Sequence, residues 1–398
     1  MDVYSVTNSA AFEDLLFVVR KISKLHCVAT KRVPINVTLR FNAEVGKLKS
    51  SQKRVKIWRA ANRILQELKD ANCKIFHKKA SKKRVNREFE MYGFAVYVVH
   101  GGYRFNVTAV NDVAVSVLFD KARSILPYEN LHGLRTTFAE TLPYKKILNL
   151  YGIHTKSLFR YEYIKKGRRR KAVETFIVRP EEPTNVERSV FFDLYPEMSA
   201  AILTMKKCIY NDEYKQVLRN FFKAVRKLGI RYIAVDLIGN PGGSSLAVQE
   251  FLRYIPQHEG FQDYKVFVRK EDQLIPFTPK INVNKEKYKD LIFDGDVYVL
   301  TGETTRNAAT RFAVLLQDNK LAKVIGESSG SKPSHYGHGT MFELPNTKLC
   351  LIVTSKEYKR PDVRKEKDTF QVPDHPIVWF QAREFFLQRI CKNGPIPP

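Results

Sequence analysis

Long apolar runs, paired cysteines and a secretion signal are all missing from this sequence. No stretch approaches the roughly 18 consecutive apolar residues that a membrane-spanning helix needs. The five cysteines are scattered singly, which argues against a disulfide framework and is typical of a reducing compartment. The first residues, MDVYSVTNSAAFEDLL, lack the charged-then-apolar pattern of a secretion signal. We therefore expect an intracellular protein, nuclear or cytoplasmic, that is not secreted and does not contact a membrane.

Acidic residues are scarce relative to basic ones. The chain has 41 Asp and Glu against 68 Lys and Arg, a formal net charge of +27 at pH 7. Residues 1–190 carry most of the excess, with 37 basic against 17 acidic residues, a difference of 20. Uncompensated positive charge repels itself and destabilises a compact fold. A polyanionic partner would relieve that repulsion, so we predict binding to DNA, RNA or another polyanion.

The basic residues gather in three runs, which are KSSQKRVK at residues 49–56, HKKASKKRVNR at residues 77–87 and KKGRRRK at residues 165–171. A solvated surface that serves solubility alone is the alternative interpretation. No zinc-finger, helix-turn-helix or RNA-recognition signature accompanies the runs, so the expected contacts go to phosphates and carry little sequence preference. The predicted polyanion-binding residues are Lys49, Lys53, Arg54, Lys56, Lys78, Lys79, Lys82, Lys83, Arg84, Arg87, Lys165, Lys166, Arg168, Arg169, Arg170 and Lys171.

The spacing of apolar residues divides the chain into three parts. Residues 1–80 form an N-terminal helical segment, because residues 10–27 and 54–70 carry apolar side chains at helical spacing. Residues 81–188 form a basic α/β linker module. Residues 189–390 alternate strand-like and helix-like stretches with short links, which predicts a layered α/β core around a largely parallel sheet.

Motifs for nucleotides and for metals are absent from the sequence. The glycine turn GNPGGSS at residues 239–245 has neither of the two glycine patterns that bind nucleotide phosphates. Cys73 and His77 would lie one turn apart in a helix, but no second ligand pair accompanies them. We therefore predict no metal and no cofactor.

Four segments of the core resemble the tail-specific, or C-terminal-processing, serine peptidase family, which includes the tricorn core. They are IAVDLIGNPGGSS (residues 233–245), DVYVLTGETTRNAATRFAVLL (296–316), KVIGESSGSKPSHYG (323–337) and FELPNTKLCLIVTSKEYKRPD (342–362). Their order and spacing fit the family, and weaker likeness extends over nearly the whole chain. The resemblance implies a crotonase/ClpP-like layered α/β core, to which a basic α/β N-terminal module is attached.

The family's two reactive groups fall on amides in this sequence. Its attacking serine matches Asn307, and an amide is neither acidic nor nucleophilic enough at neutral pH to form an acyl-enzyme. Its histidine matches Asn72, which does not titrate and cannot act as a general base. The resemblance therefore implies a divergent, catalytically inactive member, and we predict that the chain is not an enzyme.

Other parts of the family's site are retained. Gly242 and Gly243 match the glycines whose backbone N–H groups form an oxyanion hole, and Lys332 matches the lysine base of the family's Ser/Lys branch. A scaffold without its reactive groups suggests a binding or structural protein. We predict that it binds a polyanion such as DNA or RNA, either alone or by self-assembly in a larger complex.

Two alternative functions stay open. The first is an active serine peptidase with a relocated nucleophile, for which the candidate hydroxyls are those of Ser328, Ser329, Ser331, Thr304 and Thr305. The second is capture of a peptide or a small hydrophobic ligand in the vacated cleft, because the resemblance also extends to non-catalytic retinoid-binding modules.

Overall fold

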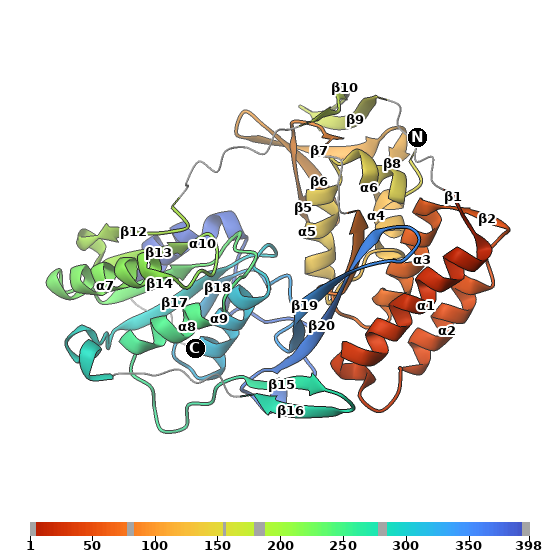
Figure 1. Ribbon diagram of the computed structural model, residues 1–398. Helices are drawn as coiled ribbons and strands as arrows, with labels where there is room; N and C mark the ends of the chain where they lie inside the picture. Colours follow the sequence, from red (N-terminus) through yellow and green to blue (C-terminus); the bar gives the residue numbers. More distant parts are fainter. Residues whose placement is uncertain (1–4, 78–82, 154–156, 179–187, 278–284, 392–398) are drawn as a thin grey trace. The chain divides into compact units, whose positions relative to one another are not determined.

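The computed structural model describes residues 5–77, 83–153, 157–178, 188–277 and 285–391. The chain divides into two compact units (Figure 1). The first unit comprises Met1–Thr184, Phe267–Ile275 and Tyr336–Glu357, and the second comprises Asn185–Val266, Pro276–His335 and Tyr358–Pro398. Both units are therefore built from segments that lie far apart in the sequence.

Helices open the first unit. α1 begins after Thr7, whose hydroxyl accepts the N–H of Ala10 at 3.2 Å and so caps the helix. The helices of this unit are α1 (Asn8–Leu25), α2 (Ile35–Val45), α3 (Arg54–Gln66), α4 (Val115–Arg123), α5 (Leu131–Thr141) and α6 (Lys145–Leu150). α1 and α3 lie where the helical spacing of apolar residues predicts them.

Two larger sheets complete the first unit. One has the strand order β10-β9-β7-β6-β5, with β8 paired to β7, and the other has the order β16-β15-β20-β19, with β3 paired to β20. The strands of the first sheet are β5 (Glu88–Tyr92), β6 (Ala95–His100), β7 (Tyr103–Val110), β8 (Val113–Ala114), β9 (Leu158–Lys165) and β10 (Arg168–Thr175). Those of the second, most of whose residues belong to this unit, are β3 (Lys74–His77), β15 (Lys265–Lys270), β16 (Gln273–Phe277), β19 (His335–Glu343) and β20 (Leu349–Lys359). Short pairs join β1 (Ser5–Thr7) to β2 (Ser51–Lys53) and β4 (Lys83–Arg84) to β11 (Ile177–Val178).

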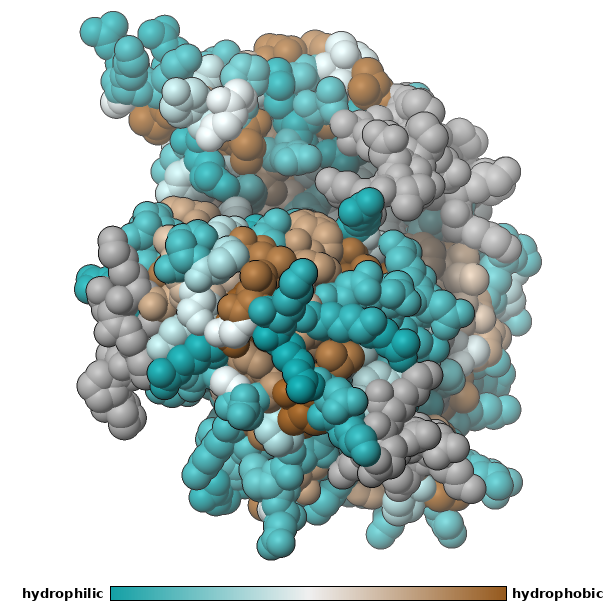
Figure 2. All heavy atoms as spheres, turned by 90° about the vertical axis from the view of Figure 1, so that its left-hand side faces the viewer, coloured by the Kyte–Doolittle hydropathy of each residue, from teal (hydrophilic) through white to brown (hydrophobic). Residues whose placement is uncertain are grey.

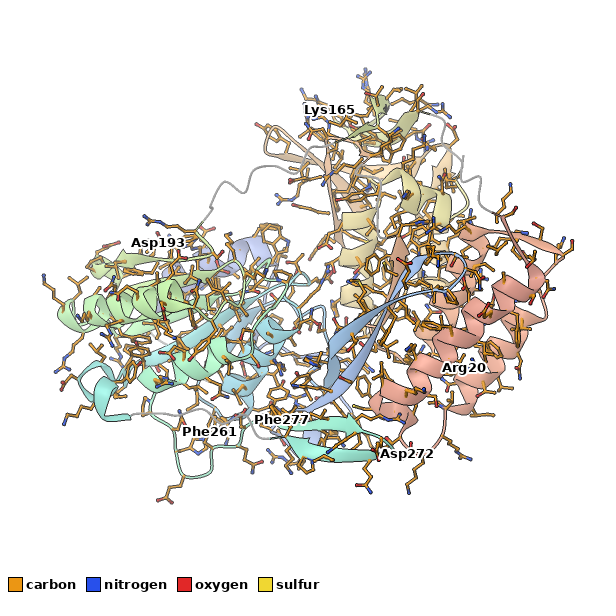
Figure 3. The ribbon with its side chains drawn as sticks, in the orientation of Figure 1. Arg20, Lys165, Asp193, Phe261, Asp272 and Phe277 are labelled. Carbon is orange, nitrogen blue, oxygen red and sulfur yellow. The ribbon has the colours of Figure 1, made fainter. Side chains whose placement is uncertain are left out.

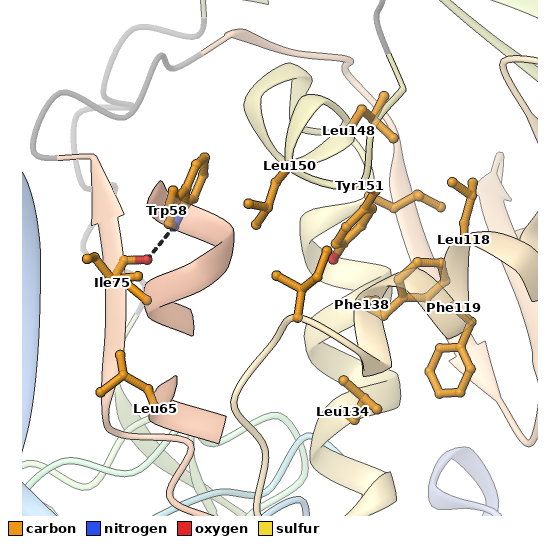
Figure 4. Close-up of a cluster of buried hydrophobic side chains, with 14 of the residues drawn as sticks. Trp58, Leu65, Ile75, Leu118, Phe119, Leu134, Phe138, Leu148, Leu150 and Tyr151 are labelled. Carbon is orange, nitrogen blue, oxygen red and sulfur yellow. Dashed lines mark hydrogen bonds between the residues drawn. The ribbon is translucent and has the colours of Figure 1, made fainter. Parts of the chain in front are cut away.

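Aromatic residues fill the core of the first unit. Trp58 of α3 donates its indole N–H to the carbonyl of Ile75 in β3 at 2.7 Å, so its polar atom is satisfied although the residue is buried (Figure 4). Phe119 of α4 packs edge-on against Phe138 of α5, with ring centroids 5.4 Å apart (Figure 4). These contacts join the helices to one another and to the neighbouring sheet.

The second unit is built on a six-stranded sheet of order β12-β13-β14-β17-β18-β21. The strands are β12 (Val190–Tyr195), β13 (Ala200–Met205), β14 (Tyr232–Asp236), β17 (Asp296–Thr301), β18 (Lys323–Gly326) and β21 (His375–Pro376). Only the β12–β13 pair is antiparallel in this sheet. The intervening helices are α7 (Asp212–Lys227), α8 (Leu246–Phe251) and α9 (Ala308–Asp318). This arrangement confirms the predicted α/β class.

Both faces of this sheet are buried. Leu203 of β13 packs with Phe222 of α7 and Phe312 of α9 on one face. Its neighbour Ile202 points to the other face, in a cluster with Phe386, which follows α10 (Trp379–Phe385). Strands covered on both sides read as nearly continuous apolar runs, which is why "SAAILTM" and "IRYIAVDLIG" carry few polar residues.

The exposed surface is largely hydrophilic where it is seen in Figure 2, with smaller apolar areas between the polar side chains. In the described parts of the chain, no helix combines the length and the apolar composition needed to cross a membrane.

A buried carboxylate ties α1 to the turn between β19 and β20. Asp14 is fully buried and accepts the backbone N–H groups of Asn346 and Thr347, each at 2.8 Å. The hydroxyl of Thr347 donates to the same carboxylate. The three donors belong to residues more than 300 positions away in the chain, so this contact joins the N-terminal helix of the first unit to its C-terminal segment.

We expect Asp14→Ala to lower the free energy of unfolding by about 3 kcal/mol, because it leaves several buried donors without an acceptor. Urea denaturation measures the change. Arg20→Ala is the matched control, since Arg20 lies exposed on the same helix (Figure 3), and its effect should stay within about 0.5 kcal/mol. Equal losses in the two variants would contradict this role of Asp14.

Candidate functional site

Three loops meet at the carboxyl edge of the parallel sheet in the second unit. Residues 237–245 follow β14, residues 302–307 follow β17, and residues 327–335 follow β18. Neighbouring parallel strands end at the same edge, which brings their loops together. The first two loops are joined by a hydrogen bond from Arg306 N to Asn240 O at 2.9 Å, and the last two by one from Gly330 N to Thr305 O at 2.9 Å.

Asn307 adopts a strained backbone conformation at the start of α9. Its φ is 52° and its ψ is −118°, a region that residues with a side chain rarely occupy. A strand, a sharp strained turn and a helix also carry the nucleophile in serine hydrolases of other folds. We call Asn307 and Ala308 the elbow. The Asn307 side chain donates from Nδ2 to the carbonyl of Pro241 at 3.1 Å, which anchors the elbow to the glycine turn.

The glycine turn approaches the elbow too closely for any side chain. A Cβ on Gly242 would lie 2.7 Å from the Cβ of Asn307 and 2.9 Å from the backbone nitrogen of Ala308. A Cβ on Gly243 would lie 2.2 Å from the carbonyl oxygen of Cys208. The φ values of the two glycines are +100° and +140°, so both the space and the backbone conformation require glycine.

Two backbone N–H groups at this place have no acceptor among the residues that the structure describes. They belong to Gly243 in the turn and to Ala308 in the elbow. The N–H of Gly242 is different, because it donates to Oδ1 of Asn240 at 2.9 Å. Unpaired N–H groups from adjacent segments are the donors that stabilise a negatively charged oxygen in acyl transfer. Of the two predicted glycines, Gly243 is therefore the one that offers a donor.

The hydroxyl of Ser331 lies against the elbow. Its Oγ accepts the N–H of Asn307 at 3.0 Å, and the residue is only 4% exposed. No residue in the described parts of the chain accepts its hydroxyl hydrogen. The third loop thus supplies a hydroxyl where Asn307 supplies none.

The other candidate hydroxyls hold the loops in place. Thr305 is fully buried, donates to Leu237 O at 2.8 Å and accepts the N–H of Gly302 at 3.1 Å. Thr304 accepts the N–H of Gly239 at 3.1 Å. Ser329 is fully buried and donates to the carbonyl of Ser331 at 3.2 Å. Ser328 is partly exposed in the same loop.

Two basic side chains follow Ser331 in the third loop. Lys332, the predicted lysine base, is half-buried. His335 is 6% exposed, and its Nδ1 lies 3.0 Å from the carbonyl oxygen of Lys332. A carbonyl can only accept, so Nδ1 of His335 carries the hydrogen of this bond. The loop therefore holds an amine and an imidazole in addition to the hydroxyl.

Asn72, the predicted counterpart of the family's histidine, lies in the first unit and acts as a donor there. Its Nδ2 donates to the carbonyl of Tyr336 at 2.9 Å and lies 3.4 Å from Oε1 of Glu129. Its backbone N–H donates to Asp70 at 2.8 Å. The Nδ2 group of Asn72 thus has two acceptors, and Asn72 stabilises the structure of the first unit.

A buried cluster of His26, Asp70 and Cys73 lies next to Asn72, with its ligand atoms within 4.8 Å of one another. The Nδ1 of His26 accepts the N–H of Val28 at 3.2 Å, so its proton is on Nε2, which donates to Asp70 at 3.3 Å. Burial raises the pKa of Asp70, but hydrogen bonds from His26 and Thr354 outweigh burial and hold that pKa below its usual value. A metal would need the Nε2 lone pair, so this tautomer does not fit a metal ligand.

The predicted polyanion-binding residues fall into two separate places in the first unit. Lys49, Lys53 and Lys56 are exposed around β2 and the start of α3, where Arg54 is half-buried. The second place joins the other two runs: Arg87 pairs with Glu174 of β10 at 2.7 Å, and Arg84 stacks on Tyr144. Lys83 is exposed, whereas Lys78, Lys79 and Lys82 lie outside the described residues. The residues exposed in the hairpin of β9 and β10 are Lys165, Lys166, Arg168, Arg169, Arg170 and Lys171.

Sequence reasoning did not single out Arg311. It lies four residues after Asn307 on α9, and its backbone N–H donates to Asn307 O at 3.0 Å. The signal was present, because Arg311 is the only charged residue in the stretch NAATRFAVLL.

Comparison with known proteins gives a family and a fold. The model of peptidase family S41 matches residues 199–377, whereas comparison with curated proteins gives no match. A solved structure of mature CPAF complexed with lactacystin is similar at 11% identity, with a TM-score of 0.69 and coverage of 97% of each chain. A CPAF mutant gives a TM-score of 0.72 at 10% identity, covering 98% of this chain and 99% of that one. The photosystem II D1 C-terminal processing protease gives 0.52 at 14% identity, covering 92% and 93%. At these identities the likeness to solved structures establishes the fold.

These matches confirm the resemblance to the tail-specific peptidases, but the prediction that the chain is not an enzyme is wrong. The matching family is a family of peptidases, and the similar folds include a processing protease. The error has a physical reason. The prediction rested on the side chains at Asn307 and Asn72. The structure adds the strained backbone of the elbow, two N–H groups without an acceptor among the described residues, and the Ser331 hydroxyl against the elbow.

We expect Gly243→Ala to lower the free energy of unfolding by about 3 kcal/mol or more, because the new Cβ would collide with the Cys208 carbonyl in a strained backbone conformation. Thermal or urea denaturation measures the loss. Gly239→Ala is the control from the same turn: it has a φ of +79° but nothing within 4 Å of the new Cβ, so it should cost only about 1 kcal/mol of backbone strain. A smaller loss at Gly243 than at Gly239 would refute the close approach.

Proposed function

Residues 199–377 form a region of peptidase family S41, and on this premise we propose that the chain hydrolyses peptide bonds with Ser331 as the attacking hydroxyl. The observation that carries the proposal is the 3.0 Å hydrogen bond from the elbow N–H of Asn307 to Ser331 Oγ. A backbone N–H aimed at an oxygen favours its charged form, so the elbow stabilises the hydroxyl oxygen as it becomes an alkoxide. The hydroxyl hydrogen has no acceptor among the described residues, so it can be given to a base.

The surrounding groups have roles in the same reaction. Ser331 Oγ bonds to the carbonyl carbon of the peptide, its proton passes to a base, and the carbonyl oxygen takes up negative charge. The N–H groups of Gly243 and Ala308 donate to that oxygen. The C–N bond then breaks, the amine leaves with the proton, and water hydrolyses the resulting ester. The base comes from the third loop, where the imidazole of His335 and the amine of Lys332 are the two candidates, each of which would have to act in its unprotonated form.

Labelling with a fluorophosphonate probe tests this assignment. We expect the probe to modify Ser331, and we expect Ser331→Ala to lower both labelling and cleavage of unstructured peptides at least about 1000-fold. Ser328→Ala removes a hydroxyl from the same loop and should keep the wild-type rate. Mass spectrometry of the digested protein locates the label. Labelling at another hydroxyl would overturn the role of Ser331, and a folded protein with neither labelling nor cleavage would overturn the proposed activity.

A second function, nucleic-acid binding by the first unit, is favoured by the hairpin of β9 and β10. We propose this hairpin, residues 165–171, as the binding site. Arg169 and Lys171 share Glu162, at 3.6 and 3.0 Å. Lys165, Lys166, Arg168 and Arg170 form no ion pair with a described residue. These four cations are therefore available to phosphates.

Strand pairing gathers the cations on an aromatic face. Arg168 lies opposite Lys165 and Arg170 lies opposite Tyr163, and directly opposite residues share one face of a sheet. The ammonium group of Lys165, labelled in Figure 3, also lies 5.4 Å from the ring centre of Phe105. Cations interleaved with aromatic rings are the combination that binds single-stranded nucleic acid through phosphates and base stacking.

A salt titration of single-stranded DNA binding tests this second function. Affinity should fall steeply between about 50 and 200 mM salt, and substituting Lys166, Arg168 and Arg170 together by Ala should reduce the salt slope by about 2 to 3. Substituting Lys49, Lys53 and Lys56 together by Ala removes the same charge elsewhere and should reduce the slope less. A flat salt dependence, or equal effects of the two triple variants, would exclude the hairpin as the binding site.

A further inference from the structure

Arg311 is a buried cation that has no counter-ion among the residues that the structure describes. The residue is 8% exposed, and its Nε is buried without a hydrogen-bond partner. In the described parts of the chain, no side chain or carbonyl accepts a hydrogen bond from its guanidinium, and no carboxylate forms an ion pair with it. Burying a charge in this way is costly, because the group loses its hydration and gains no ionic partner.

Another buried arginine of the same unit shows what a satisfied one looks like. The guanidinium of Arg360 is 3% exposed and binds both carboxylate oxygens of Asp318, at 2.6 and 3.0 Å. It also lies 3.2 Å from Asp368. Arg360 is thus paired with two carboxylates, whereas Arg311 has no carboxylate partner in the described parts of the chain.

The aromatic rings and the thiol nearest to Arg311 do not supply a negative charge. Its guanidinium carbon lies 3.9 Å from the ring centre of Tyr358 and 6.0 Å from that of Tyr264, so it lies next to aromatic rings. Burial raises the pKa of Tyr264, whose hydroxyl donates to Pro333 O at 3.0 Å, and burial raises the pKa of Cys208 to about 12. Both groups are therefore neutral at pH 7.

The position of Arg311 relates it to the elbow. Residues four apart on a helix lie on the same face, so Arg311 lies on the same face of α9 as Asn307, one turn further along. Pro333, which accepts the hydroxyl of Tyr264, belongs to the loop that carries Ser331. Arg311 is thus connected to the loop that carries Ser331 through the ring of Tyr264, 6.0 Å away.

We propose that Arg311 binds a carboxylate of the peptide substrate and so selects peptides that present one at this place, an inference that rests on the proposed peptidase function. A carboxylate accepts two parallel N–H bonds from a guanidinium, and it would supply the acceptor that the described residues do not offer to Arg311. The carboxylate can be the C-terminus of the peptide or an Asp or Glu side chain. Arg311 is a specificity residue in this proposal and takes no part in bond cleavage.

The test measures binding on the full-length Ser331→Ala protein, which cannot turn the peptide over if Ser331 is the nucleophile. The probes are fluorescein-labelled Ala/Leu peptides with a free C-terminus, the same peptides with a C-terminal amide, and amidated peptides with one internal Glu or Gln. Fluorescence anisotropy gives the dissociation constants. We expect a carboxylate-bearing peptide to bind about 10- to 100-fold more tightly than its neutral partner.

Substitution of Arg311 separates this role from a structural one. Arg311→Gln should abolish the preference for the carboxylate, Arg311→Lys should keep part of it, and Lys227→Gln, which removes one exposed charge from α7, should leave it unchanged. Without peptide, Arg311→Gln should unfold at the same temperature as the parent or higher, because it removes an uncompensated buried charge. A structural arginine would instead lower that temperature.

The outcomes distinguish the two proposals. A preference for the free C-terminus or for the internal Glu identifies the source of the carboxylate. Equal binding of charged and neutral peptides, or a preference that survives Arg311→Gln, overturns the role of Arg311 while the labelling of Ser331 still decides the peptidase function. If the wild-type protein shows Ser331 labelling and none of the peptides bind, the carboxylate specificity of Arg311 is refuted and the proposed peptidase function stands.

Discussion

The candidate site depends on one steric constraint, the close approach of the glycine turn to the elbow. Gly242 leaves no room for a side chain beside Asn307 and Ala308, and Gly243 leaves none beside the Cys208 carbonyl. Hydrogen bonds from Cys208 N to Gly242 O and from Ser244 N to Cys208 O, at 3.0 and 2.7 Å, hold the turn in place. With the turn fixed, Asn307 keeps its strained conformation, and no described residue accepts the N–H groups of Gly243 and Ala308. The chemistry proposed for this site needs that backbone arrangement as well as the hydroxyl of Ser331.

The sequence predicts much of the fold because its signals are local. Periodic apolar residues mark α1 and α3, and strand–helix alternation after residue 189 predicts the parallel sheet. The glycines of the turn can be read from the sequence, but only the structure shows the close contacts that exclude a side chain at these positions. Pairings between distant segments carry no such local signal. β3 pairs with β20 across more than 270 residues, and Asp14 meets Thr347 across 333.

The sequence is less informative about the candidate site, because a matched position does not reveal which atoms lie beside it. Asn307 and Asn72 predict the absence of chemistry when each is considered alone. Ser331 is one of several hydroxyls in a polar loop, and only its 3.0 Å contact with the elbow distinguishes it from Ser329. Arg311 resembles an ordinary helix residue in the sequence, and only the structure shows that its buried Nε has no hydrogen-bond partner among the described residues. At each of these positions the role depends on contacts with residues that are distant in the sequence, and such contacts cannot be predicted from residue spacing.

The discontinuity of the first unit has a consequence for synthesis on the ribosome. Residues 1–184 emerge first, yet the strand that pairs with β3 and the turn that satisfies Asp14 are translated only near residues 345–352. Until then the apolar side chains Leu344, Leu349 and Leu351, which belong to the same core, cannot cover it. A nascent chain stalled midway would therefore present an incomplete apolar surface, of the kind that chaperones bind. Most of the second unit is therefore translated before the last strands of the first unit.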